Sequence, residues 1–143
     1  MIHKVNRLKP EDYAELLAES LSEGHRHIRR LIDDYSTGQN RFEHPDEALF
    51  EYRIDGMLTG VCGLNRDPYS DECSGRVRRM YVLNAYRRQG IGRALLEAVI
   101  DESSRHYRRL VLNTGSAQAD LFYARLGFTR LDSQEHATHV LEF

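Results

Sequence analysis

A basic loop with two glycines, between an apolar run and a helix, is the part of the chain best suited to chemistry. The loop spans residues 84–92, and the charged and small residues in and just after it are Arg87, Arg88, Gly90, Gly92 and Arg93. A helix begins with unpaired N–H groups and partial positive charge, so its first turn attracts anions. Glycine lets a ligand reach the backbone, because no Cβ intervenes. The loop is therefore predicted to bind a phosphate or pyrophosphate.

Two common phosphate-binding motifs do not fit this loop. The dinucleotide fingerprint G-x-G-x-x-G lacks its third glycine, since Leu95 stands there, and the NTPase motif G-x-x-x-x-G-K-[ST] occurs nowhere in the chain. The stretch RRQGIG at residues 87–92 instead resembles the R/Q-x-x-G-x-G/A signature of the GNAT acetyltransferase superfamily. In that family the signature cradles the pyrophosphate of acetyl-CoA. The preceding run MYVLNAY, residues 80–86, is similar to the family's fourth strand.

Three further segments carry the same resemblance along the chain. Asn113-Thr114-Gly115 ends a short apolar strand pattern, and residues 135–139, EHATH, precede a last strand. Residues 121–128, LFYARLGF, are similar to the family's A-x-x-L/F-Y-x-x-x-G-F helix, with Ala119 in the alanine position. The resemblance thus covers nearly the whole chain and implies a GNAT-like acyl-CoA N-acyltransferase fold.

The resemblance also implies where acetyl-CoA, the expected cosubstrate, is held. Backbone groups of Met80 and Val82 would pair with the pantetheine arm like an added strand, and the Met80 amide would face the acetyl carbonyl. Loss of such a backbone donor typically raises a barrier by about 3–4 kcal/mol. The implied binding residues are Met80, Tyr81, Val82, Arg87, Arg88, Gln89, Gly90, Ile91, Gly92, Arg93 and Asn113.

Tyr123 is the predicted catalytic residue. It matches the helix tyrosine that the family places near the CoA sulfur, where a phenol can protonate the departing thiolate. Spacing alone would favour a core aromatic beside Phe122 and Leu126. The complete motif favours the catalytic role.

The base that would take a proton from the attacking amine is not evident. Many relatives carry a glutamate near the start of the strand before the loop, but residues 75–79 read GRVRR and contain no acid. An alkylamine with a pKa near 10 keeps a small neutral fraction at pH 7, so a water chain could suffice. The open alternatives are Glu47, Asp67, Asp71, Glu72, His139 or water.

No metal and no disulfide is expected. The pairs His25–His27 and His136–His139 have spacings seen in zinc sites, but no third ligand accompanies either pair in a recognisable pattern. The two cysteines do not form a disulfide framework, and Cys62 falls in a predicted core strand.

The leading functional hypothesis is transfer of an acetyl group from acetyl-CoA to a primary amine, by direct attack in a ternary complex. The resemblance builds the acceptor pocket from residues 22–28, 65–69 and 136–139. Nearby acids, Glu47, Asp67 and Asp71, predict a preference for cationic amines, and a small-molecule acceptor is favoured over a protein. Two alternatives remain: a module that binds acyl-CoA without turnover, and a protein N-acetyltransferase.

Composition predicts one ordinary globular domain over residues 1–143, of which 41% are hydrophobic and 29% charged. The net charge of −2 and a pI of about 6.4 provide no global field for nucleic acid. No apolar run approaches the roughly 18 residues of a membrane span, and the first residues show no signal-peptide pattern. A cytoplasmic protein with no membrane partner is expected. The oligomeric state stays open, a homodimer included.

Hydrophobic periodicity supplies the elements that must position these residues. It predicts helices after Pro10, around residues 28–35, from Ile91 and over 117–126. It predicts strands at residues 3–8, 48–54, 58–64, 77–83, 110–113, 128–131 and 138–143. The order predicts an α/β fold with one mixed sheet flanked by helices, and a parallel crossover around the helix after Gly92.

Overall fold

The computed structural model describes residues 1–70 and 73–143, and in them one seven-stranded mixed sheet runs in the order β1-β2-β3-β4-β5-β7-β6. Its only parallel pair among the described strands is β4 with β5, which flank α3 in sequence. The predicted mixed sheet is confirmed. The strands are β1 (Ile2–Lys4), β2 (Ala48–Ile54), β3 (Met57–Arg66), β4 (Ser74–Val82), β5 (Arg109–Leu112), β6 (Thr129–Arg130) and β7 (His139–Glu142).

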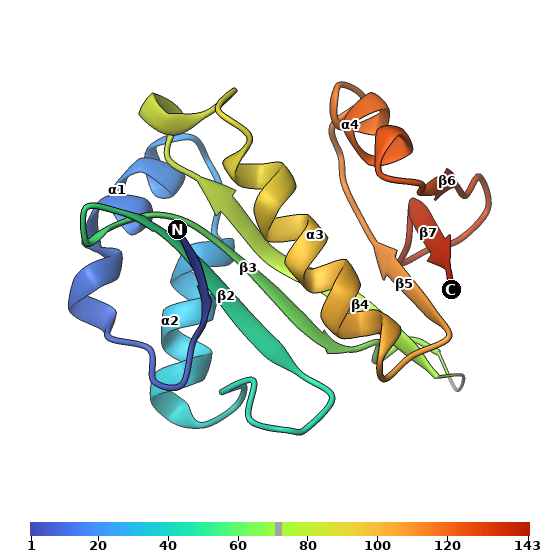
Figure 1. Ribbon diagram of the computed structural model, residues 1–143, viewed down its shortest axis with the longest axis horizontal. Coiled ribbons are helices and arrows are strands. Elements are labelled where there is room, and N and C mark those ends of the chain that lie inside the picture. Colours follow the sequence, from blue (N-terminus) through green and yellow to red (C-terminus); the bar gives the residue numbers. More distant parts are fainter. Residues whose placement is uncertain (71–72) are drawn as a thin grey trace.

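Helices cover both faces of this sheet (Figure 1). α3 contributes Leu95, Leu96 and Val99 to the core on one face, and α1 and α2 pack a second core against the other. No helix in the described part of the chain is long and apolar enough to cross a bilayer. The helical elements are η1 (Pro10–Tyr13), α1 (Ala14–Ser22), α2 (His27–Thr37), η2 (Asn84–Tyr86), α3 (Ile91–Ser104) and α4 (Ala119–Arg125).

Local signals set most of the boundaries. Asp55 and Gly56, with φ of 51° and 81°, form the two-residue turn between β2 and β3, since a type I′ hairpin needs positive φ at both positions. Gly38 ends α2 in the left-handed region, as predicted. The first strand is shorter than predicted. The chain leaves the sheet after Val5, whose amide donates to the Leu49 carbonyl. The amide of Leu8 donates to the Tyr35 hydroxyl instead of to a strand.

The central strand β4 separates from β5 part-way along its length. On one edge of β4, β5 pairs only with Ser74 to Arg76. On the other edge of β4, β3 stays paired as far as Val82. A register shift in the β3–β4 pairing accompanies Arg79, whose φ is 59°. From Val77 onward, one edge of β4 therefore has no strand beside it, and β4 and β5 diverge toward α4 (Figure 1).

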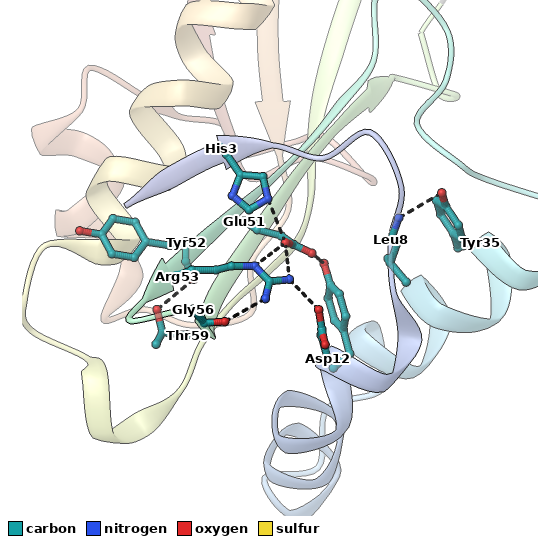
Figure 2. Close-up of polar contacts among 10 residues, drawn as sticks. His3, Leu8, Asp12, Tyr35, Glu51, Tyr52, Arg53, Gly56 and Thr59 are labelled. Atoms are coloured by element: carbon teal, nitrogen blue, oxygen red, sulfur yellow. Dashed lines mark hydrogen bonds and ion pairs between the residues drawn. The ribbon is translucent and has the colours of Figure 1, made fainter.

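A buried carboxylate joins the N-terminal elements to the sheet. Glu51 on β2 is 2% exposed and accepts hydrogen bonds from the Tyr13 hydroxyl at 2.5 Å and from the Arg53 guanidinium at 2.9 Å and 3.1 Å. Arg53 also reaches Asp12, and His3 approaches Glu51 at 3.2 Å, so the charges converge on one point (Figure 2). Such a group is costly to leave half-paired, because Glu51 and Tyr13 are buried and cannot exchange a lost partner for water.

The Glu51→Gln variant should therefore lose about 3 kcal/mol of unfolding free energy, because the buried Tyr13 hydroxyl loses its carboxylate acceptor and Arg53 keeps only Asp12 as a charged partner. Urea denaturation followed by circular dichroism measures the change. The matched control is Asp101→Asn, which breaks an exposed ion pair with Arg105 and should cost about 0.5 kcal/mol or less. Equal losses in the two variants would contradict the role given to this network.

Candidate active site

A cleft opens where β4 leaves β5. It has two adjoining halves, of about 820 Å³ and 750 Å³, and five residues line both: His25, His27, Met80, Ser116 and Tyr123. The loop half continues along Tyr81 and Val82 to Arg87 and is closed by α4. The arginine half continues the other way along β4, from Val77 to Arg79, with Arg30 of α2 and residues 112–116 as further walls. The strand edge left bare by β5 thus forms one side of a continuous cleft.

The basic loop leads into α3 through a glycine in the left-handed region. Gly90 has a φ of 82° and precedes the first helical residue, so the amides of the first turn have no partner within the helix. A Cβ placed on Gly90 would contact nothing within 4 Å, so its face is open. Gly92 differs, because a Cβ there would lie 3.1 Å from Cε of Met80. Gly90 thus leaves room for an anion, and Gly92 lets α3 pack closely on β4.

Arg87 is held by other protein groups rather than standing free. Its Nε donates to the Val82 carbonyl at 2.8 Å, and its terminal nitrogens donate to Glu23 at 3.0 Å and 3.3 Å. Glu23 also accepts from the Tyr81 hydroxyl at 2.7 Å, and its pKa is lowered by the hydrogen bonds from Arg87 and then Tyr81. Arg87 therefore fixes the end of β4 to the turn after α1, and most of its charge is balanced.

The other predicted loop ligands differ in what they can offer. Arg93 pairs with Glu97 at 2.7 Å on the surface, and Arg88, with a φ of 65°, forms no ion pair within the described residues. Gln89 is exposed, whereas the Ile91 side chain is 3% exposed in the core, and neither residue lines the cleft. Asn113 is exposed on the wall opposite β4.

Tyr123 stands at the junction of the two halves. Its ring packs against Phe122, Phe128 and His139, with centroids 5.2 Å, 5.8 Å and 5.4 Å away. Burial, with a smaller effect of Cys62, raises the pKa of the phenol to about 12. The phenol is therefore protonated at neutral pH and can only donate to an anion that forms beside it. The ring therefore packs in the core, as the spacing indicated, and also lines the cleft, and its catalytic role stays a prediction.

His139, one of the predicted bases, lies behind Tyr123 and not in the cleft. Its side chain is 1% exposed, and its ring nitrogens bond to Asp120 at 2.6 Å and to the Thr138 hydroxyl at 2.9 Å. Neither half of the cleft is lined by it. An incoming amine would not meet this imidazole, so His139 supports the position of the Tyr123 ring instead.

The acidic candidates are also held away from the cleft. Asp67 pairs with Arg76 at 2.9 Å and its side chain is 6% exposed, while Glu47 accepts from Asn65 at 2.8 Å beside a separate cavity. Neither lines the cleft, so their positions give no support to the prediction that they attract a cationic amine. Asp71 and Glu72 lie outside the described residues.

His25, in the turn after α1, and His27, the first residue of α2, line the cleft although neither was among the predicted bases. His25 and His27 line both halves, with ring centroids 5.5 Å apart. Nε2 of His27 is buried and has no hydrogen-bond partner in the described part of the chain. Its pKa is lowered by burial and then by His25. The spacing suggested a metal pair, but the described residues contain no group of three His, Cys, Asp or Glu side chains that could hold a metal ion.

Comparison with known proteins shows the family to which this chain belongs. The family model for the GNAT acetyltransferase domain matches residues 45–130. This chain belongs to the GNAT acetyltransferase family. The match covers β2 to β6 and thus includes β4, the basic loop and α4. The family predicted from the sequence is confirmed.

Two solved structures agree with this fold along nearly the whole chain, and one further relative matches part of the sequence. A protein assigned as an acetyltransferase from Exiguobacterium sp. 255-15 is 34% identical, with a TM-score of 0.88 over 99% of this chain and 92% of its own. A GNAT acetyltransferase from Elizabethkingia anophelis, solved with acetyl-CoA bound, is 22% identical with a TM-score of 0.66, over 100% of this chain and 97% of its own. The mycothiol acetyltransferase of Salinispora arenicola is 31% identical over 99 residues, 68% of this chain, which spans 31% of that protein's length.

The open face of Gly90 generates a direct test of the loop. Gly90→Val should abolish binding of coenzyme A, because the new side chain fills the anion's approach, and should leave a folded protein. Isothermal titration calorimetry measures the affinity, and circular dichroism checks the fold.

The matched control is Gly56→Val, which has nearly the same φ of 81° and the same open surroundings, but lies in the β2–β3 turn. It carries equal backbone strain without touching the cleft. Wild-type affinity in Gly90→Val, or equal loss of affinity in both variants, would rule out the loop as the phosphate site. The milder pair, Gly90→Ala and Gly56→Ala, repeats the comparison if valine prevents folding.

Proposed function

We propose that the protein transfers an acetyl group from acetyl-CoA to a primary amine, by direct attack of the amine in a ternary complex. The observation that carries the proposal is the cleft along the unpaired edge of β4, which runs from the phenol of Tyr123 to Arg87, three residues before the open turn at Gly90. Coenzyme A would supply the activated acyl group as a thioester.

The donor fits the loop half by charge and by backbone geometry. Amides at the start of α3 would hold the pyrophosphate, with Arg88 adding a positive charge at the turn. The edge of β4 from Met80 to Val82 has no strand beside it, so its backbone groups are available to the amide groups of the pantetheine arm. The Met80 amide would then face the acetyl carbonyl and stabilise its developing negative charge.

Tyr123 would stabilise the sulfur as it departs. Because the pKa of its phenol is about 12, well above that of a thiol, the phenol acts mainly by donating a hydrogen bond to the thiolate. The proton that finally neutralises the sulfur would come from the amine nitrogen, through His27 or water. The C–S bond breaks, the C–N bond forms, and one proton passes from nitrogen to sulfur.

His27 would accept that proton. Its pKa lies below the ordinary 6.5, so the imidazole is neutral at pH 7 and its buried Nε2 can take a proton. A weak base suffices, because the nitrogen becomes much more acidic as it bonds to the carbonyl carbon. The arginines beside it disfavour an ammonium ion in the cleft, which keeps the incoming amine neutral without a carboxylate base.

A small-molecule acceptor is favoured over a protein. The acceptor would occupy the arginine half, a cleft of about 750 Å³, which suits a compact molecule. The Salinispora relative, named a mycothiol acetyltransferase, is in line with an acceptor of that size.

Substituting Tyr123→Phe should lower kcat about 10–100-fold while the affinity for coenzyme A changes less than threefold, because the hydroxyl acts only on the forming thiolate. Thiol release with a panel of amines gives kcat, and calorimetry gives the affinity. Tyr52→Phe, in β2 and away from the cleft, serves as the control and should keep full activity. Unchanged turnover in Tyr123→Phe would remove it from the mechanism.

The pH dependence tests His27. In the wild type, kcat should fall as the pH drops through the lowered pKa of His27, below 6.5, because protonation removes the acceptor site, and should be level above it. His27→Gln should lower kcat at pH 7 about tenfold or more and abolish this acid-side inflection. His44→Gln, at an exposed histidine outside the cleft, should retain the wild-type kcat at pH 7 and the acid-side inflection. An unaltered profile in His27→Gln would exclude it as the base.

A further inference from the structure

We infer that the acceptor is a primary amine that also carries an anionic group, a carboxylate or a phosphate, bound by Arg78 and Arg30 in the arginine half of the cleft. This inference rests on the proposed function and names the substrate class for it. The chemistry follows from the side chains that line this half, because a guanidinium recognises the planar oxygens of either anion.

Arginine dominates the lining of this half. Arg30, Arg76, Arg78 and Arg79 line it together with His25 and His27, and none of its described lining residues is an acid. The chain as a whole has a net charge of −2, so the positive charge here is local and not a general excess. A low-dielectric wall on each side strengthens the field of such a group of charges.

Acids beyond the cleft balance only part of this charge. Arg76 is paired with Asp67, and Arg79 reaches Asp34 at 3.6 Å from the α2 side. Arg30 and Arg78 form no ion pair or hydrogen bond through their side chains in residues 1–70 and 73–143.

Mutual repulsion within the group supports an anion as its missing partner. The pKa of Arg79 is lowered by its burial and then by the charge of Arg78, with a smaller contribution from Arg30, and only Asp34 opposes them. Guanidinium groups placed this close are stabilised when a bound anion lies between them. The same charges weaken binding of an ammonium ion, so they select an acceptor whose amine is neutral and whose other end is negative.

Position along the strand sets the size of the acceptor. Met80 marks the reacting carbonyl in the proposed mechanism, and Arg78 precedes it by two strand positions, roughly 7 Å. Amine and anion would therefore lie within about one nanometre of each other. The pyrophosphate loop lies in the opposite direction along the chain, beyond Val82, so Arg78 is not placed to hold the phosphates of coenzyme A.

Matched acceptors test the inference. Thiol release at saturating acetyl-CoA compares leucine with leucinamide, and glucosamine 6-phosphate with glucosamine, so that each pair differs in its anion. We expect kcat/KM to be at least about tenfold higher for the anionic member of one pair, which also tells carboxylate from phosphate. Added salt should lower kcat/KM for that acceptor more than for its neutral partner.

Variants connect the preference to the arginines. Arg78→Gln and Arg30→Gln should each raise KM for the anionic acceptor about tenfold, with kcat changed less, while Arg78→Lys should recover part of the loss. Arg29→Gln is the matched control, since Arg29 is the neighbour of Arg30 on α2 but pairs with Asp33 on the surface. Calorimetry of the same acceptors on the protein saturated with coenzyme A gives affinities without turnover.

These measurements distinguish failure of the anionic acceptor from failure of the proposed acetyl transfer. Equal or better use of the neutral amines, or an unchanged preference in both Gln variants, would overturn the anionic acceptor and leave acetyl transfer standing. Anion-dependent binding by calorimetry that is lost in Arg78→Gln, without thiol release from any amine, would support the anion site and contradict the proposed reaction. Neither binding nor release with any member of the two pairs would overturn this inference.

Discussion

The end of the pairing between β4 and β5 is the constraint on which the rest of this molecule depends. Backbone hydrogen bonds hold the two strands together only up to Arg76, and the edge of β4 beyond it belongs to the cleft. Arg76 fixes this point, because its guanidinium donates to Asp67 at 2.9 Å and to the His136 carbonyl at 2.6 Å and lies over the Tyr69 ring. The start of β4, the loop before it and the distant segment at His136 are thus tied together where the strands separate.

Charge balance divides the arginines of the cleft into two groups. Arg87 and Arg76 are paired with carboxylates and have structural roles, Arg76 near the start of β4 and Arg87 just after its end. Arg78 and Arg30 have no such partner among the described residues and face the space where an acceptor would enter. Arginines with similar sequence contexts therefore have different roles, and the position of the nearest acid decides which.

The positive charge of the arginines in the cleft offers a physical reason why residues 75–79, at the start of β4, contain no acidic residue. A carboxylate base helps by removing a proton from an ammonium ion, whereas a cleft lined by guanidinium groups disfavours that ion from the start. In the proposed mechanism the imidazole of His27, with its buried Nε2, would need only to receive a proton that bond formation has already made acidic. Met80, His27 and Tyr123 line both halves at their junction. In the proposed mechanism they would act there on the carbonyl, the amine and the sulfur, respectively.

Much of the framework could be predicted from the sequence because its signals are local. The turn at Asp55-Gly56, the end of α2 at Gly38 and the glycine-spaced loop before α3 each depend on a few neighbouring residues and their allowed φ values. The order of strands and helices follows from apolar periodicity in the same way. The GNAT resemblance of the loop and of the Tyr123 helix is also local, since each motif is contiguous.

Only the tertiary structure decided which side chains share the cleft and which charges are cancelled. Glu23 neutralises Arg87 across 64 residues, and the burial of His139 behind Tyr123 removes it from the bases that the sequence had offered. His27 lies on α2, which precedes β2 and β3 in the chain, whereas Met80 lies on β4. No spacing rule connects the two residues, although both line the cleft. The sequence by itself determined the fold, the family and the glycine-spaced loop before α3, because these are set by short-range patterns. Burial and ion pairing were left to the folded chain, because both are properties of contacts between distant segments.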